Sequence, residues 1–337
     1  MKPAMLLVGL MWCGAAARAQ SWVVQNSPTT ASLRGVRAIS DRVAWASGSN
    51  GTYLRTIDGG EHWTAAQVPG AEKLDFRGIW PIDDRIAYLM SAGPGELSRI
   101  YKTDDAGAHW TLLYTQSNAK GFFDTIAFWD GHTGLVLGDP LDGSAELLST
   151  TDGGAHWSRL KTPPALPGEG AFAASNSCVF VRGSRDAWFV TGGPGAARVI
   201  RSRDAGRTWK AAATPIRNDG QGAGIFSVAF RDSDHGVIVG GDYSKDKEGR
   251  QTAAYSSDGG KSWKSSTIPP AGFRSSVKYL PKPGLWIATG TSGSDVSRDD
   301  GRTWTHFDDG AYNALSFTRN GVTGWAVGPK GRIAKYR

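Results

Sequence analysis

Short apolar segments separated by polar, glycine-rich turns run along almost the whole chain. The clearest unit lies between residues 76 and 115, where four successive segments have the sequences FRGIWPI, RIAYLMSA, SRIYKT and HWTLLYT. Segments of this length, rich in β-branched and aromatic residues and bounded by turn residues, are typical of β-strands. No run of about 12 residues carries apolar residues at the three- and four-residue spacing of an amphipathic helix. The pattern therefore predicts an all-β protein made of four-stranded antiparallel units.

The first strand of this unit recurs seven times along the chain. Its copies begin near Leu33, Phe76, Phe123, Ala174, Phe226, Phe273 and Tyr312. A repeat period of about 40 to 55 residues, with turn residues at one fixed point, is typical of β-propellers, in which each repeat forms one blade. The repeats predict a ring of seven blades and a single propeller domain over residues 20–337.

An eight-residue motif, Ser/Thr-x-Asp-x-Gly-x-x-Trp, marks six of the seven repeats. It occupies residues 56–63, 103–110, 150–157, 202–209, 256–263 and 297–304. In a tight turn, an Asp carboxylate can accept hydrogen bonds from backbone amides of its own turn. The Gly supplies a positive φ, and the Trp packs between neighbouring sheets. We therefore assign a structural role to Asp58, Asp105, Asp152, Asp204, Asp258 and Asp299.

These motifs resemble the Asp-box, or bacterial neuraminidase repeat. The series of repeats as a whole resembles the photosystem II stability/assembly factor family of seven-bladed propellers, and the resemblance covers essentially the whole chain after residue 19. Asp-boxes also occur in sialidases, xyloglucanases and sorting receptors, so the resemblance indicates the fold more strongly than the function. For function it implies a non-catalytic scaffold with a role in assembly.

The seventh repeat lacks an Asp-box and a fourth strand. A candidate for the missing strand lies near the other end of the chain, where Trp22 precedes Pro28 by six residues. The same step separates an Asp-box Trp from a Pro in four other repeats, namely Trp63 and Pro69, Trp157 and Pro163, Trp209 and Pro215, and Trp263 and Pro269. We therefore expect residues 21–28 to form the outer strand of blade seven. Pairing of the two chain ends would close the ring and remove exposed strand edges.

Residues 1–19 carry one early Lys, an apolar stretch and the small-x-small ending Ala17-Arg18-Ala19. Such a segment is typical of a secretory signal peptide and is too short to remain as a membrane span. We therefore expect a monomer that is secreted or periplasmic after cleavage and has no membrane span. Removal of the segment lowers the formal net charge from +7 to +5. This mildly basic balance suits an acidic partner without requiring nucleic acid.

Cys178 is the one cysteine beyond the predicted signal peptide, so no intramolecular disulfide can form. In the apolar run NSCVFV we expect it to be a small buried residue rather than a reactive thiol, because reactivity needs an exposed, electropositive setting. The sequence has no G-x-G-x-x-G between a strand and a helix, no haem or copper ligand set and no Cys pair. We therefore disfavour an oxidoreductase and expect neither a cofactor nor a metal.

Functional residues are expected on the face of the disc opposite the Asp-boxes, where the loops between blades converge. Alignment of the starts of the inner strands gives one polar column, which consists of Arg34, Arg77, Asp124, Ser175, Ser227, Arg274 and Asn313. Three Arg from blades six, one and two would form an arc of donors for a carboxylate or phosphate. We therefore predict a ligand-binding site made of Arg34, Arg77, Arg274, Asp124 and Asn313. Alternatively, each Arg pairs with a neighbouring acid or reaches solvent.

Long glycine-rich loops in blades three to five bring further acidic residues toward the same rim. The candidate catalytic residues are Asp139, Glu169, Asp242 and Tyr243. A pair of carboxyl groups can serve as general acid and as base or nucleophile in glycoside hydrolysis. Sialidases also carry a Phe/Tyr-Arg-Ile-Pro signature, from which FRGI at 76–79 and FRSS at 273–276 depart.

Two classes of function remain open at this point. The first is an exported, non-catalytic scaffold that recognises a protein or an anionic ligand, carbohydrate included, on the face opposite the Asp-boxes. The second is a sialidase-like or other glycoside hydrolase that uses carboxylates on the rim loops of blades three to five. Nucleic acid is not an expected partner of either.

Overall fold

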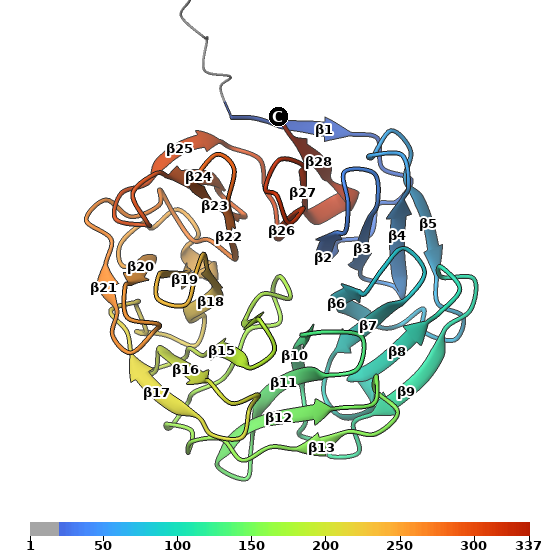
Figure 1. The fold of residues 1–337 in the computed structure, drawn as a ribbon, viewed down its shortest axis with the longest axis horizontal. Coiled ribbons are helices and arrows are strands. Elements are labelled where there is room, and N and C mark those ends of the chain that lie inside the picture. The colour runs from blue at the N-terminus through green and yellow to red at the C-terminus, as the bar shows by residue number, and fades with distance from the viewer. Residues whose placement is uncertain (1–19) are drawn as a thin grey trace, which may run out of the picture.

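The computed structural model describes residues 20–337, and the signal peptide predicted over residues 1–19 lies outside them. Seven four-stranded antiparallel sheets are arranged as a ring (Figure 1). The sequence-based prediction of a seven-bladed all-β propeller is therefore confirmed. The helices of the described chain are three short 3₁₀ turns, η1 (Gly95–Leu97), η2 (Tyr243–Lys245) and η3 (Pro329–Gly331). Within residues 20–337, no helix has the length and apolar character needed to span a membrane.

Each blade runs from its inner strand at the centre of the ring to its outer strand at the rim (Figure 1). Blade one consists of β2 (Leu33–Ala38), β3 (Ala44–Gly48), β4 (Thr52–Thr56) and β5 (Thr64–Gln67). Blade two consists of β6 (Asp75–Pro81), β7 (Ala87–Ala92), β8 (Arg99–Thr103) and β9 (Thr111–Thr115). Blade three consists of β10 (Phe123–Phe128), β11 (Gly134–Leu141), β12 (Ser144–Thr150) and β13 (Ser158–Arg159). Blade four consists of β14 (Val179–Arg182), β15 (Asp186–Val190), β16 (Arg198–Ser202) and β17 (Lys210–Ala213).

The remaining three blades follow the same order. Blade five consists of β18 (Ala223–Phe230), β19 (Gly236–Asp242), β20 (Ala253–Ser256) and β21 (Lys264–Ser265). Blade six consists of β22 (Ser276–Leu280), β23 (Leu285–Gly290), β24 (Gly293–Ser297) and β25 (Thr305–Asp308). Blade seven consists of β26 (Ala314–Phe317), β27 (Gly324–Val327) and β28 (Ile333–Tyr336), with β1 (Trp22–Gln25) as its outer strand.

Tryptophans at one position of the second strand fill the space between blades. A Trp occupies the second residue of that strand in blades one, six and seven and the third in blade four, and all four are fully buried. Asp-box tryptophans pack edge-on against two of them, Trp45 and Trp325. The ring of Trp63 in blade one, for example, lies 6.3 Å from that of Trp325 in blade seven, at an interplanar angle of 87°. Large apolar side chains thus hold neighbouring sheets together at a fixed spacing.

The Asp-box turns lie between the third and fourth strands of their blades, as predicted. Each Asp carboxylate accepts a hydrogen bond from the backbone N–H of the residue four positions later, at 2.9 to 3.0 Å. The side chain of that later residue is a His, Ser or Thr, and it bonds the second carboxylate oxygen. The Gly two residues after the Asp has a positive φ in every copy; the value at Gly60 is 83°. All six Asp residues thus make contacts within their own turns.

Acid is expected to destabilise the propeller through these turns. Hydrogen bonds lower the pKa of Asp105, chiefly from the His109 amide, and of Asp204, chiefly from the Thr208 hydroxyl, to about 2. A carboxyl group whose pKa is lower in the folded than in the unfolded chain stabilises the fold above its unfolded value near 3.8. We therefore expect the melting temperature to hold at pH 5 and to fall between about pH 4 and pH 2.

Thermal melts at pH 5, 4, 3 and 2.5 would measure this loss. The variant Asp204→Asn should melt at a lower temperature than the wild type at pH 5, and its melting temperature should fall less on acidification. Asp41→Asn, at an exposed position, should follow the wild type. A wild-type melting temperature that is flat down to pH 2.5 would contradict the expectation.

The ring closes through the first and last strands of the described chain, which lie side by side in Figure 1. β1 pairs antiparallel with β28, and Trp22 lies opposite Tyr336. The Trp22 side chain is buried against Tyr312 and Tyr336, and its ring nitrogen donates to the Ser294 hydroxyl in blade six at 3.1 Å. The prediction that residues near 21–28 complete blade seven is therefore confirmed.

Gln25 on the closing strand ties blade seven to blade one. Its amide nitrogen donates to the carbonyl oxygen of Gly60 in the first Asp-box at 2.6 Å. Its amide oxygen accepts from the ring nitrogens of Trp63 at 3.2 Å and Trp325 at 3.1 Å. The closing strand thus supplies polar contacts to the neighbouring blade as well as backbone pairing.

Cys178 is fully buried, as predicted. Its Sγ lies 2.7 Å from the carbonyl oxygen of Phe172, and burial raises the pKa of the thiol to about 12. The thiol therefore stays protonated and belongs to the core.

Candidate functional site

Bulges at the starts of the inner strands direct side chains into the centre of the ring. The strand pairing skips one residue in blades one, two, three and five, and the skipped residues are Arg34, Arg77, Asp124 and Phe226. A bulged residue is left out of the ladder, and its strand bends there. All four line a cavity of about 520 Å³. The cavity therefore results from one irregularity repeated in four blades.

This cavity lies on the face opposite the Asp-boxes. The Asp-box turns contact the turns that follow the inner strands; the Gly59 amide, for example, donates to the Arg42 carbonyl oxygen at 2.8 Å. The bulged residues lie at the other ends of the same strands. Blades three and five complete the wall with Asp139 near the end of β11 and Tyr243 in η2.

Arg34 and Arg77 flank a single acid, Asp75. The Arg77 Nε donates to Asp75 Oδ2 at 2.8 Å, and its Nη1 donates to the carbonyl oxygen of Ala173 at 2.9 Å. The Arg34 Nε lies 3.7 Å from the same carboxylate oxygen and has no hydrogen-bond partner among the described residues. Burial lowers the pKa of Arg34, although the Asp75 charge opposes this effect. One carboxylate thus serves two guanidinium groups and leaves the donors of Arg34 available.

Asp124 and Asp139 form a second feature of the wall. Burial, followed by the nearby charge of Asp139, raises the pKa of Asp124 well above its usual range. Burial also raises the pKa of Asp139, whose Oδ1 accepts from the Ala171 amide at 3.0 Å. The Oδ2 of Asp124 has no hydrogen-bond partner within residues 20–337. Both shifts act against the charged form of these carboxyl groups.

The opposite side of the cavity is aromatic. Phe226 stacks on Phe172 with ring centroids 3.9 Å apart, and it meets Phe273 and Tyr243 edge-on at 4.6 and 6.3 Å. Sequence alignment had placed Ser227 at this position of blade five, but the bulge brings Phe226 into the cavity and buries Ser227. A polar arc and an aromatic wall therefore share one cavity.

Arg274 does not line this cavity, which corrects its assignment to the ligand-binding site. Its amide donates to Gly240 O, just as the amide of Leu33 donates to Gly328 O. Arg274 thus occupies the position of a buried residue, and Ser275 takes the position of Arg34 and lines the cavity. The sequence alignment was one residue out of register in blade six, and a one-residue slip moves a side chain to the other face of a strand.

Arg274 instead forms an ion pair inside blade six. Its Nε donates to Asp295 Oδ2 at 2.5 Å, and its Nη1 donates to the Phe273 carbonyl oxygen at 2.7 Å and to the Ser292 hydroxyl at 3.0 Å. The exposed fractions of the Arg274 and Asp295 side chains are 0% and 1%. The pair is therefore part of the core. Asn313, in contrast, lines the cavity, and its amide donates to Leu33 O at 2.8 Å.

Glu169 is used inside the fold, which corrects the expectation that its carboxylate serves the rim. The side chain is 1% exposed and lies against Arg198, whose Nε donates to Oε1 at 2.8 Å. The Thr191 hydroxyl and the Leu166 amide also donate to this carboxylate. All of these contacts fold the loop before β14 onto blade four.

Asp242 likewise has a local partner. Its Oδ1 accepts from the amide and the hydroxyl of Ser244, at 2.9 and 2.6 Å, and caps η2. Tyr243 lies beside it with 58% of its surface exposed and is part of the aromatic wall. Of the four candidate catalytic residues, Asp139 and Tyr243 line the central cavity, whereas Glu169 and Asp242 hold loops.

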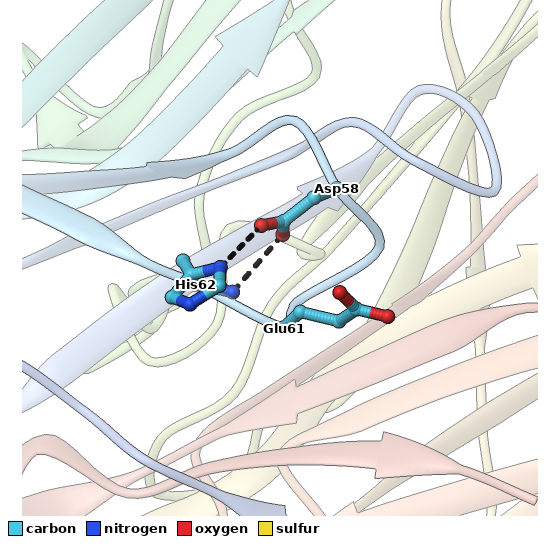
Figure 2. A group of neighbouring side chains, drawn as sticks. All are labelled: Asp58, Glu61 and His62. Atoms are coloured by element: carbon cyan, nitrogen blue, oxygen red, sulfur yellow. Dashed lines mark hydrogen bonds and ion pairs between the residues drawn. The ribbon is translucent and has the colours of Figure 1, made fainter.

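One Asp-box has an additional carboxylate beside its His. Asp58, Glu61 and His62 each offer one ligand atom within 4.8 Å of the others. Figure 2 shows the Asp58 carboxylate bonded to His62, while the Glu61 carboxylate points away from the His62 imidazole. The same Asp–His contact occurs at Asp105 and Asp152, where alanine replaces Glu61. We therefore regard the contact as part of the turn.

Comparisons with known proteins agree with this architecture. A family model described as photosynthesis system II assembly factor YCF48 matches residues 87–215. The fold is similar to a structure of YCF48 bound to a D1 peptide, with 17% identity, a TM-score of 0.67 and coverage of 95% of this chain and 97% of that one. It is equally similar to YCF48 from Cyanidioschyzon merolae, with 15% identity, a TM-score of 0.67 and coverage of 95% and 99%. Sequence comparison with curated proteins finds no match.

A glycoside hydrolase is also similar in fold. The GH74 enzyme of Niastella koreensis has 14% identity to this chain and a TM-score of 0.62 over 92% of it, but the chain spans only 53% of that enzyme. The fold and its repeats define a seven-bladed Asp-box propeller. Within that class, the protein resembles the photosystem II assembly factors.

Proposed function

We propose that the protein is a non-catalytic, exported scaffold that binds an acidic segment of a partner protein in the cavity opposite the Asp-boxes. The observation that carries the proposal is the pairing of available Arg34 donors with an aromatic wall in a single cavity. Guanidinium groups bind carboxylates with two parallel hydrogen bonds, and aromatic rings receive apolar side chains. A peptide that combines both groups fits this surface.

The size of the cavity supports a peptide as the ligand. Binding pockets usually enclose about 300 to 1,000 Å³, and a cavity of about 520 Å³ admits a few side chains. The similar YCF48 structure holds a D1 peptide. By analogy, we propose that the partner of this chain also presents a peptide. Export and a monomeric state belong to the proposal; the sequence of residues 1–19 supports export, and the closed ring supports a monomer.

The double variant Arg34→Ala/Arg77→Ala is expected to lose peptide affinity by about tenfold to a hundredfold. Each charge-assisted hydrogen bond contributes about 1.5 to 3 kcal/mol, and tenfold in affinity corresponds to about 1.4 kcal/mol. Fluorescence anisotropy with a labelled D1 peptide and a panel of acidic peptides would measure the loss. The exposed pair Arg207→Ala/Lys210→Ala removes the same charge from another part of the surface and should bind normally.

Two results would count against this function. One is a set of acidic peptides whose binding does not depend on Arg34 and Arg77. The other is turnover of aryl glycosides that is lost in Asp124→Asn or Asp139→Asn, since these two carboxyl groups form the acidic pair of the cavity. The second result would favour the glycoside hydrolase instead.

A further inference from the structure

The other end of the channel forms a separate cavity of about 700 Å³. It is lined by the last residues of all seven inner strands and lies on the Asp-box side of the ring. Figure 1 shows these inner strands surrounding the centre of the ring. The cavity shares no lining residue with the peptide cavity. The two cavities are therefore separate candidate sites.

Two cationic residues in this cavity, Arg37 and Lys278, occupy inner-strand positions at which the other six blades have uncharged residues. At the position of Lys278, the other six inner strands have Val36, Ile79, Ile126, Val179, Val228 and Leu315. At the position of Arg37, the other six have Trp80, Ala127, Phe180, Ala229, Tyr279 and Ser316. The propeller fold therefore does not need a charge at either position.

Neither cation has an acidic partner among the described residues. The Arg37 guanidinium lies 3.2 Å above the centroid of the Trp80 ring, and the Lys278 Nζ lies 5.9 Å from that of Phe180. No hydrogen bond or ion pair formed by residues 20–337 involves either charged group. Arg231, in the same cavity, shows the contrast, since its Nε donates to Asp300 Oδ1 at 2.7 Å.

The surroundings of Arg37 and Lys278 disfavour the charged forms of both side chains. Burial lowers the pKa of Arg37 to about 9, and burial together with the Arg37 charge lowers the pKa of Lys278 to about 7. The other charged groups of the cavity are Arg182, which lies 3.9 Å from Asp186, the paired Arg231, and Arg319. The local excess is therefore positive. An anion in the cavity would offset the cost of burying both charges.

The strands that carry Arg37 and Lys278 lie on either side of a strand that contributes a hydroxyl group to the same cavity. β26 of blade seven lies between β22 and β2 in the ring (Figure 1). Its Ser316 lines the cavity, and the Ser316 Oγ accepts from the Ala38 amide at 3.1 Å. Because that contact uses an oxygen lone pair, the hydroxyl proton remains a donor. Guanidinium, hydroxyl and ammonium donors thus come from three successive blades.

We propose that this end of the channel binds a compact oxyanion, a carboxylate or a phosphate, through Arg37, Lys278 and Ser316. The site is distinct from the peptide cavity. Free inorganic phosphate and a small carboxylate present the same chemistry, so the experiment must separate them.

Thermal melts with inorganic phosphate or succinate, at pH 6 and constant ionic strength, test the site directly. At least one anion should raise the melting temperature of the wild type, and calorimetry should show at least about tenfold weaker binding to Lys278→Met. Without anion, Lys278→Met should be as stable as the wild type or more stable, because it removes an unpaired charge that is half-buried. Lys264→Met, at an exposed position, should behave as the wild type in both measurements.

A pH series distinguishes a lysine that binds the anion from a lysine with a purely structural role. With sulfate, whose charge is constant between pH 6 and 9, affinity should be highest below pH 7 and fall as the Lys278 ammonium of the free protein loses its proton. In protein with ¹³C-dimethylated lysines, saturating sulfate should move the Lys278 titration to higher pH.

The proposal is overturned if phosphate, succinate and sulfate stabilise the wild type and Lys278→Met equally, or stabilise neither. It is also overturned if the Lys278 titration does not respond to sulfate. The variant Arg34→Ala/Arg77→Ala should keep the anion effect, so failure of the peptide proposal and failure of this one are distinguishable.

Discussion

Deletion of residues 20–27 is expected to leave a protein that aggregates and lacks a cooperative thermal transition. The deletion removes β1 and leaves β28 as an unpaired strand edge beside a half-open blade. Exposed edges pair with other chains, and a propeller avoids them by closing its ring. Size-exclusion chromatography and circular dichroism melts would show the effect. A truncated chain that elutes and melts as the wild type does would refute this account of closure.

A graded version of the same experiment uses single residues of the closing strand. Trp22→Ala should destabilise the protein by about 3 to 5 kcal/mol, as large-to-small changes of buried aromatic residues do. Val24 lies on the same strand with 61% of its surface exposed, so Val24→Ala should have little effect. Equal losses in the two variants would mean that the strand acts through backbone pairing alone.

The variant Arg274→Ala is expected to lose about 3 to 5 kcal/mol of stability and to bind peptide normally while folded. Removing one member of a buried ion pair leaves the other charge without a partner, and the burial of Asp295 makes that costly. Urea denaturation would measure the stability, and anisotropy below the transition would measure binding.

A matched double variant separates the charge effect from packing. Arg274→Leu/Asp295→Asn removes both charges, places in blade six the residue that blade one carries as Leu33, and keeps an acceptor for the Ala271 amide. It should recover most of the lost stability. Weaker peptide binding in folded Arg274→Ala, with binding unchanged in Arg34→Ala, would restore Arg274 to the ligand site.

The fold was predictable because its determinants are local and repeated. Each Asp-box is a closed set of hydrogen bonds within eight residues, so its sequence alone specifies the turn. The closing strand was predictable for the same reason, since Trp22 occupies the place of an Asp-box Trp before a Pro six residues later. These features do not depend on how the rest of the chain packs.

The site was less predictable because it depends on single-residue irregularities. Arg34, Arg77 and Asp124 line the cavity that the alignment of inner strands pointed to, but no residue type in blade five marks the bulge that turns Phe226 into it. In blade six, the polarity of Arg274 suggested a surface position, yet Asp295 on a different strand allows it to be buried. The partners that hold Glu169 and Asp242 are likewise formed only in the folded chain.

Lys278 and Arg37 could have been found from the sequence by a comparison of the repeats. A charged residue in a column of Val, Ile and Leu is visible once the inner strands are aligned. The two ends of one inner strand lie at opposite faces of the ring and line different cavities.

The pairing of β1 with β28 also sets an order of events in folding. β1 is the first described strand and precedes the six complete blades, whereas its partner β28 follows all of them. Because contacts between distant segments form slowly and late, the first six blades can pack while the seventh waits with three strands. The ring can therefore close only after residues 333–336 have been made. Until then the packed blades form an open arc, and the edge of β1 is unpaired.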